Sequence, residues 1–301
     1  MNVENIKVFS KNILTKGYYC NEYGNDDDKN KDIKLNLYIS INDVCNARCK
    51  FCNIPNSKSL GSIFDISKLE VVLKELKKSD RLNRIAITGG ETFLNIDLLN
   101  QIIDCITKNI EQPFITINTN GSFLNRISDI KNIDEIDGIH ISRHHYDDSK
   151  NNEIFGIKTA AMNEINEANK KYGNNLIRLN CNLIKGYIDS YDEVEKYLNI
   201  AIQNDIFRVG FVGLMKINNF CEEKYVNFKH FIFGEDIIRT RQLYDTNICE
   251  CENYVYYSGE TGKTIEAYFR QVKDLNCNYC RQLSYTCDNK ILSGFGKKPI
   301  I

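Results

Sequence analysis

Three cysteines stand close together on one short stretch, Cys45, Cys49 and Cys52, in the spacing C-x3-C-x2-C. Thiolates bind soft metal ions and the irons of iron–sulfur clusters. Three thiolates on one loop can hold three irons of a cubane 4Fe–4S cluster and leave the fourth iron without a protein ligand. Because such an iron can bind and activate a small molecule, the spacing predicts reaction chemistry at this loop.

A zinc site, or three unrelated thiols, is the alternative interpretation of the same stretch. Structural zinc takes four ligands, which usually lie near one another in the sequence. The chain offers no Cys or His between Cys52 and Cys105. The spacing therefore favours an iron–sulfur cluster over zinc.

The composition narrows the class of protein. The chain carries 39 basic and 40 acidic residues, so it lacks the excess of positive charge that binding along a phosphate backbone requires. Its first residues resemble no signal segment, and no apolar run approaches the roughly 18 residues of a membrane span. We therefore expect a cytoplasmic protein with no membrane and no nucleic-acid partner, whose 12 cysteines are free or bound to metal.

Strand and helix patterns alternate after a charged N-terminal extension at 1–34. Apolar runs typical of strands lie at 35–41, 84–88, 114–118, 138–142, 176–184 and 207–214. Segments with helical periodicity lie at 66–78, 96–108, 158–171 and 189–203. This alternation predicts an α/β protein with a parallel sheet, and six units fit a partial (β/α)6 barrel better than a closed barrel of eight. In such sheets ligands bind at the carboxyl ends of the strands, where the cysteine loop begins.

The cysteine loop and the turn after the second expected strand together resemble the radical S-adenosylmethionine (radical SAM) enzymes. The residue before the last cysteine is aromatic, Phe51, as that family prefers. The second strand ends in Gly89-Gly90-Glu91, which resembles the GGE motif that receives the amino group of SAM. The family usually has Pro at the next position, where this chain has Thr92.

The resemblance implies an enzyme whose open iron binds SAM, so that an electron from the cluster yields a 5′-deoxyadenosyl radical. It implies that Cys45, Cys49 and Cys52 are catalytic, and that a reductant such as flavodoxin or ferredoxin supplies the electron. The residues implied to contact the cofactor are Phe51, Gly89, Gly90, Glu91, Thr119, Asn120, Ser142, Arg178 and Asn182. Arg178 and Asn182 belong to a stretch that loosely resembles the molybdenum-cofactor GTP cyclase branch, and strand alternation puts them on one face with Asn180.

The stretch after Ser142 departs from the family pattern. The family has an apolar residue and then an acid here, whereas this chain has Arg143-His144-His145. An imidazole at this place can bind substrate or move a proton near neutral pH. The two histidines can equally cover the barrel mouth and bond to their neighbours, and the sequence leaves both interpretations open.

A second group of cysteines follows the barrel: Cys249, Cys251, Cys277, Cys280 and Cys287. The stretch 254–269 between them predicts a β-hairpin with a Gly-rich turn. This order resembles the Twitch and SPASM domains, which bind auxiliary 4Fe–4S clusters, although one expected cysteine after the hairpin is missing. The resemblance implies a single second cluster on Cys277, Cys280, Cys287 and one of Cys249 or Cys251. A structural zinc site is the alternative.

The resemblance divides the chain into the extension at 1–34, a radical SAM partial barrel at 35–217 and a small, cysteine-rich, Twitch-like β-hairpin domain at 218–301. We expect an oxidoreductase that abstracts hydrogen from a peptide or small-molecule substrate in a biosynthetic pathway. The alternatives are an enzyme that acts on a nucleotide, as the GTP cyclases do, and a non-catalytic iron–sulfur or zinc protein.

Overall fold

The computed structural model describes residues 3–8, 11–16, 35–52, 64–79, 82–173, 176–245, 249–272 and 282–293. In these ranges the chain forms one large mixed sheet with helices on its outer face, and a separate two-stranded sheet of β1 (Val3–Val8) and β2 (Lys11–Lys16). Every helix in the described ranges is too short or too polar to cross a bilayer.

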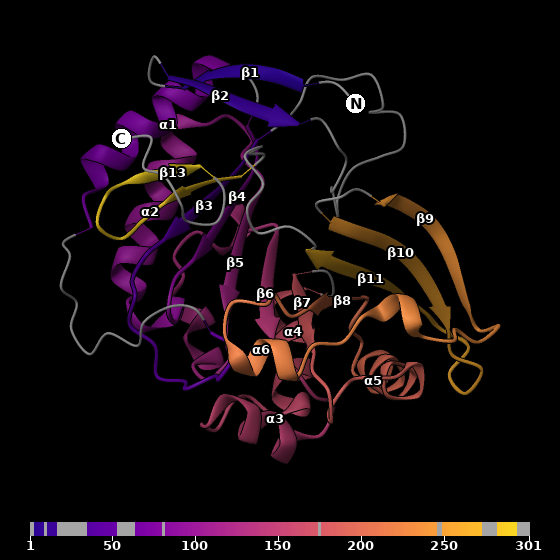
Figure 1. Ribbon diagram of the computed structural model, residues 1–301. Helices are drawn as coiled ribbons and strands as arrows, with labels where there is room; N and C mark the ends of the chain where they lie inside the picture. Colours follow the sequence, from indigo (N-terminus) through magenta and orange to yellow (C-terminus); the bar gives the residue numbers. More distant parts are fainter. Residues whose placement is uncertain are drawn as a thin grey trace.

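Six parallel strands in chain order make the centre of the sheet (Figure 1). They are β3 (Leu35–Ser40), β4 (Leu82–Thr88), β5 (Ile115–Thr119), β6 (Gly138–Ser142), β7 (Ile177–Leu183) and β8 (Arg208–Gly213). Each strand pairs in parallel with the next, from β3 with β4 to β7 with β8. The predicted parallel sheet and partial barrel are therefore confirmed, with strand ends within two residues of those expected.

Helices connect the strands and cover the outer face of the sheet (Figure 1). The α-helices are α1 (Ile66–Ser79), α2 (Ile96–Asn109), α3 (Asp148–Phe155), α4 (Met162–Tyr172), α5 (Tyr191–Gln203) and α6 (Asn219–Glu223). Short 3-10 helices are η2 (Thr92–Leu94), η3 (Leu124–Asp129), η4 (Ile133–Glu135) and η5 (Phe228–His230). The short helices α3 and α6 have no counterpart among the predicted elements, and both lie at the carboxyl ends of the central strands.

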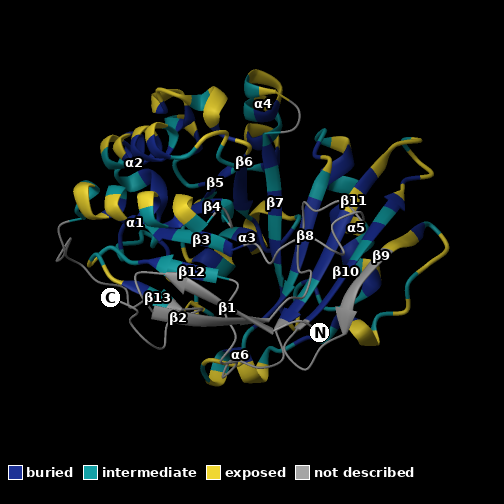
Figure 2. Ribbon diagram, turned by 90° about the horizontal axis from the view of Figure 1, so that it is seen from above, coloured by how far each residue is buried: buried dark blue, intermediate teal, exposed yellow. Residues whose placement is uncertain are grey.

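Burial follows the periodicity of each element. In α1 the buried residues are Leu69, Val72, Leu73 and Leu76, one face of the helix. In β7 buried residues alternate with partly exposed ones, so that Leu179 and Cys181 face the helices while Asn180 and Asn182 face the inside of the barrel. Figure 2 shows the same division, with buried residues along the strands and exposed ones on the outer sides of the helices.

The C-terminal strands extend the same sheet at both edges. They are β9 (Ile237–Asp245), β10 (Cys249–Tyr257), β11 (Thr264–Val272), β12 (Gln282–Tyr285) and β13 (Ile291–Ser293). Strand β11 pairs in parallel with β8, and β12 pairs in parallel with β3 at the other edge. The antiparallel pair β10–β11 is the hairpin expected near 254–269. Its assignment to a Twitch-like domain stays a prediction, and so do the domain boundaries.

Candidate functional site

The start of the cysteine loop is bonded to the turn that ends β4. The amide of Gly90 donates to the carbonyl of Asn42 at 2.9 Å, and the amide of Glu91 donates to the carbonyl of Val44 at 2.8 Å. The side-chain amide of Asn42 donates back to the carbonyl of Glu91 at 3.0 Å. Backbone pairing between β3 and β4 therefore continues past the strand ends and into the loop that carries the cysteines.

This pairing leaves no room for side chains at the two glycines. A Cβ atom on Gly90 would lie 2.0 Å from the carbonyl oxygen of Val44, and one on Gly89 would lie 2.7 Å from that of Asn42. Both contacts are to backbone, which cannot swing aside as a flexible side chain can. Glycine is therefore required here by the close approach of two backbone segments.

The three cysteines of the loop border a cavity of about 370 Å³ inside the barrel, at the carboxyl ends of its strands. The sulfur of Cys45 accepts hydrogen bonds from the amide of Ala47 at 3.4 Å and from the side chain of Asn120 at 3.8 Å. Burial raises the pKa of Cys45, and it raises the pKa of Cys49 to about 12, with additional effects from the neighbouring thiolates. The thiolate forms of Cys45 and Cys49 therefore need a cationic partner in this place.

The donor set fits an iron–sulfur cluster with one open iron. Three sulfurs face a cavity, and N–H groups donate to the sulfur of Cys45, as they do around protein-bound clusters. No three His, Cys, Asp or Glu side chains in the described ranges are close enough to hold a single metal ion. The ligands of a cubane lie at different corners of the cluster, so they stand further apart than the ligands of one ion.

Helix α6 and the residue before it contact the cysteine loop. The side chain of Asn218 donates to the carbonyl of Lys50 at 3.2 Å. The thiol of Cys221 is buried and donates to the carbonyl of Phe51 at 3.7 Å. These two contacts help to support the loop that carries the cysteines.

Glu91 is buried, and its carboxylate accepts hydrogen bonds from neighbouring residues of the protein. The hydroxyl of Thr119 donates to it at 2.6 Å, the amide of Asn120 at 2.7 Å and the amide of Phe93 at 3.0 Å. Burial raises the pKa of Glu91, while these hydrogen bonds favour the charged form. Because the side chain is satisfied, a contact between Glu91 and a cofactor would use the backbone.

Most of the residues expected to bind cofactor lie around the same cavity. Those that border it are Phe51, Gly89, Gly90, Thr119, Asn120, Ser142 and Asn182. Glu91 and Arg178 do not border it. The cavity thus gathers side chains from β4, β5, β6 and β7 beside the cysteine loop, and the individual roles stay predictions.

Several residues that border the cavity were missed from the sequence. They are Tyr38, Arg84, Asn118, His140, Tyr268 and Arg270, apart from the smaller and apolar ones. His144 and Asn180, which the sequence had already indicated, border it as well. The alternation of β3 carries a signal for Tyr38, which sits between the buried Leu37 and Ile39. Arg84 alternates in the same way with the buried Ile85 and Ile87 of β4. Arg270 could not be found in this way, because nothing in the sequence indicates that β11 joins β8.

The second cysteine group is only partly described. Cys251 is buried in β10 and Cys287 is half-buried after β12. Cys277, Cys280 and the side chain of Cys249 lie outside the described residues. The auxiliary cluster stays a prediction.

Comparisons with known proteins agree with this geometry. Residues 39–209 match the family described as the Radical SAM superfamily. The GTP 3′,8-cyclase of Alkaliphilus oremlandii is 26% identical over 260 residues, which cover 85% of this chain and 79% of that protein. The GTP 3′,8-cyclase of Peptoclostridium acidaminophilum is 25% identical over 270 residues, which cover 85% and 78%. The structure of Streptococcus suis SuiB bound to S-adenosylmethionine matches with a TM-score of 0.48 and 19% identity, covering 63% of this chain and 43% of that one.

The close contact at Gly90 predicts the effect of one added methyl group. We expect Gly90→Ala to push the backbone of Val44 away, to destabilise the fold by roughly 1–3 kcal/mol and to lower the iron bound after anaerobic reconstitution. Gly259→Ala is the matched control, since a Cβ there meets nothing within 4 Å. If Gly90→Ala binds as much iron as the wild type, the pairing does not position the cysteines.

Proposed function

The chain belongs to the radical SAM superfamily, and we propose that this enzyme cleaves SAM at a cluster held by Cys45, Cys49 and Cys52 and acts on a phosphorylated small molecule of the nucleotide class. The family implies a 4Fe–4S cluster, SAM and a source of electrons. When bound, the cluster and SAM supply a 5′-deoxyadenosyl radical that can abstract a hydrogen atom from a substrate. Membership of the family removes the non-catalytic alternative.

The observation that carries the proposal is the grouping of three thiols, a Gly-Gly backbone and two guanidinium groups around one cavity. The thiols of the loop are suited to hold the cluster. Gly89 and Gly90 allow the end of β4 to pack closely on the cysteine loop, and both border the cavity beside the thiols. Asn120 links the cysteine loop to Glu91. Its side-chain amide donates to the sulfur of Cys45, and its backbone amide donates to the carboxylate of Glu91.

The charge inside the cavity supports an anionic substrate. Arg84 and Arg270 border the cavity, and Arg84 also donates to the hydroxyl of Tyr38 at 2.8 Å. None of the described residues that border it is an Asp or a Glu. Burial lowers the pKa of His140 well below its usual value, and the positive charges of Arg84 and Arg178 lower it further. Guanidinium groups bind phosphate through paired N–H donors, which suits a phosphorylated molecule.

The named relatives support the same substrate class. Two relatives that cover 85% of this chain carry the name GTP 3′,8-cyclase. Those names favour the nucleotide alternative over the peptide substrate that we expected first from the sequence. We therefore propose a nucleotide, with GTP as the compound to test first.

The proposal includes a second iron–sulfur cluster on the C-terminal cysteines. Cys277, Cys280 and Cys287, with Cys249 or Cys251, keep the order that resembles a cluster-binding C-terminal domain. Strand β10, which carries the last two of these cysteines, pairs with β11, and β11 also supplies Arg270 to the cavity. A cluster on this segment would therefore be connected to the substrate site through two paired strands.

The proposal makes a direct prediction for Cys49. We expect Cys49→Ala, reconstituted with iron and sulfide and reduced with dithionite, to form no 5′-deoxyadenosine from SAM. Loss of one of three ligands leaves the cluster without stable attachment. Cys105→Ala is the control, because Cys105 is buried against α1 and lies away from the cavity. Formation of 5′-deoxyadenosine by Cys49→Ala would show that the cluster is held elsewhere.

The substrate class is tested by Arg270. We expect Arg270→Gln to weaken GTP binding roughly 10- to 100-fold, the effect of losing a charged hydrogen bond to phosphate, and to leave SAM binding nearly unchanged. Equilibrium dialysis of reconstituted protein with each ligand measures both affinities. Arg239→Gln is the control, since Arg239 is half-exposed on β9 and pairs with Glu252. If GTP does not bind the wild type, or binds Arg270→Gln equally well, the nucleotide proposal is wrong.

A further inference from the structure

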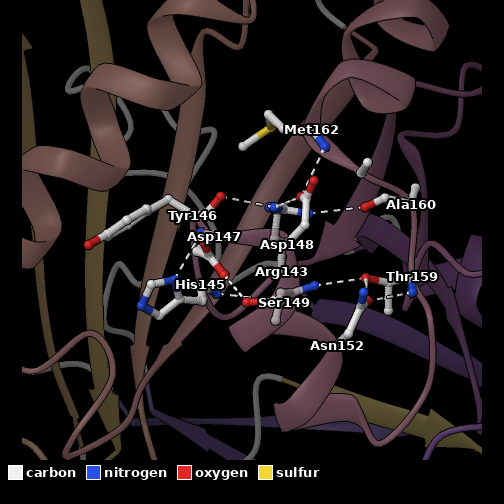
Figure 3. A network of polar contacts seen from close by, with 12 residues as sticks. Arg143, His145, Tyr146, Asp147, Asp148, Ser149, Asn152, Thr159, Ala160 and Met162 are labelled. Carbon is white, nitrogen blue, oxygen red and sulfur yellow. Dashed lines mark hydrogen bonds and ion pairs between the residues drawn. The ribbon is translucent and has the colours of Figure 1, made fainter.

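The segment after β6 is held in place by a buried arginine. Arg143 donates to the carbonyls of Ala160 and Tyr146, each at 3.0 Å, and forms an ion pair with Asp148 (Figure 3). Asp148 also accepts a hydrogen bond from the amide of Met162 at 3.3 Å. These contacts join the segment to the start of α3 and to the start of α4. The backbone that carries His144 and His145 therefore has little freedom.

The ring of His144 is fixed as firmly as its backbone. Its amide donates to the side chain of Asn151 at 2.7 Å, and its Nδ1 accepts from the amide of Asn182 at 3.0 Å. Phe155 stacks on one face of the ring at 4.8 Å between centroids, and Phe51 of the cysteine loop meets it edge-on at 5.0 Å. The imidazole thus lies between α3 and the residue that precedes Cys52.

These contacts determine where the ring carries its hydrogen. Because Nδ1 accepts a hydrogen bond, the hydrogen of the neutral imidazole is on Nε2. Burial lowers the pKa of His144 to about 3, so the ring stays neutral near pH 7. His144 borders the cavity, and no atom in the described part of the chain accepts a hydrogen bond from its Nε2. The neutral ring therefore presents one fixed donor to the cavity.

His145 matches its neighbour in its hydrogen bonds, since its Nε2 likewise has no partner among the described residues, but its ring lies in a different place. Its Nδ1 accepts from the amide of Asp147 at 2.9 Å, which closes the turn before α3 (Figure 3). Its ring lies against Tyr146 at 4.3 Å between centroids and does not border the cavity. The two histidines that the sequence could not separate thus have different surroundings: His145 shapes the segment, and His144 faces the ligand space.

We propose that the Nε2–H of His144 donates a hydrogen bond to an oxygen acceptor of the molecule bound in the cavity. This inference rests on the proposed function, because that molecule is either SAM or the nucleotide. Both carry suitable oxygens, in hydroxyl groups, carboxylate or phosphate. A carboxylate side chain at this position would accept hydrogen bonds from hydroxyl groups. A neutral imidazole fixed through Nδ1 can only donate, so it selects for an acceptor.

Two substitutions separate the two nitrogens of the ring. In His144→Asn the side-chain oxygen takes the position of Nδ1, so it can still accept from the amide of Asn182, but no donor reaches the position of Nε2. In His144→Gln the amide nitrogen reaches the position of Nε2 and retains the donor. His145→Asn is the matched control, because its oxygen can accept from the amide of Asp147 in the same way.

The test is equilibrium dialysis of anaerobically reconstituted protein against SAM and, separately, against GTP. We expect His144→Asn to weaken binding of one ligand about tenfold, the effect of one lost hydrogen bond. His144→Gln and His145→Asn are expected to stay within about threefold of the wild type, with iron content equal in all variants.

Each outcome has one meaning. A loss for SAM assigns the acceptor to SAM, and a loss for GTP alone assigns it to the nucleotide. Unchanged affinity of His144→Asn for both ligands overturns the proposal, and so does an equal loss in His145→Asn, which would indicate a general effect on the segment. Failure of the wild-type protein to bind SAM contradicts the proposed function instead.

Discussion

The site depends on the backbone pairing between the cysteine loop and the turn that ends β4. Two amide–carbonyl hydrogen bonds, from Gly90 to Asn42 and from Glu91 to Val44, fix the loop before its first cysteine. The carboxylate of Glu91 also holds the end of β5 in place, because it accepts hydrogen bonds from the hydroxyl of Thr119 and the amide of Asn120. A single turn thereby sets the position of the loop and of the next strand, and the glycines are what permit the contact.

Electrostatics divides the cavity into two regions with different requirements. Burial raises the pKa of Cys45 and of Cys49, so their thiolate forms require positive charge from metal. The guanidinium groups of Arg84 and Arg270 border the same cavity and favour a negatively charged ligand. Neutral groups also border the cavity, including the amides of Asn180 and Asn182 and the imidazole of His144. This arrangement suits a cluster and an anionic molecule held side by side.

The local parts of the fold and the site could be predicted from the sequence. The alternation in β7 and the periodicity in α1 depend on neighbouring residues, and both were predicted within one or two residues. The spacing of the cysteines and the Gly-Gly-Glu turn are local patterns too. The sequence also placed Thr119 and Asn120 at the end of a strand, where the structure has them.

The parts that could not be predicted depend on contacts between distant segments. Strands β11 and β12 join opposite edges of the sheet, so Arg270 reaches the cavity from a segment that the sequence assigned to another domain. The carboxylate of Glu91 bonds to β5, which the motif alone does not indicate. His144 and His145 are adjacent in the chain, and contacts with distant segments distinguish them: the amide of Asn182, 38 residues away, donates to His144, whereas the nearby amide of Asp147 donates to His145.

The central claim is that the loop of Cys45, Cys49 and Cys52 holds a cluster with one iron open to SAM. Electron paramagnetic resonance of the dithionite-reduced protein, recorded before and after addition of SAM, tests it most directly. We expect a reduced 4Fe–4S signal that changes when SAM is added, because SAM becomes a ligand of the open iron. A signal that is unaffected by SAM, or one that persists in the protein with all three cysteines replaced by Ala and still responds to SAM, would contradict the claim.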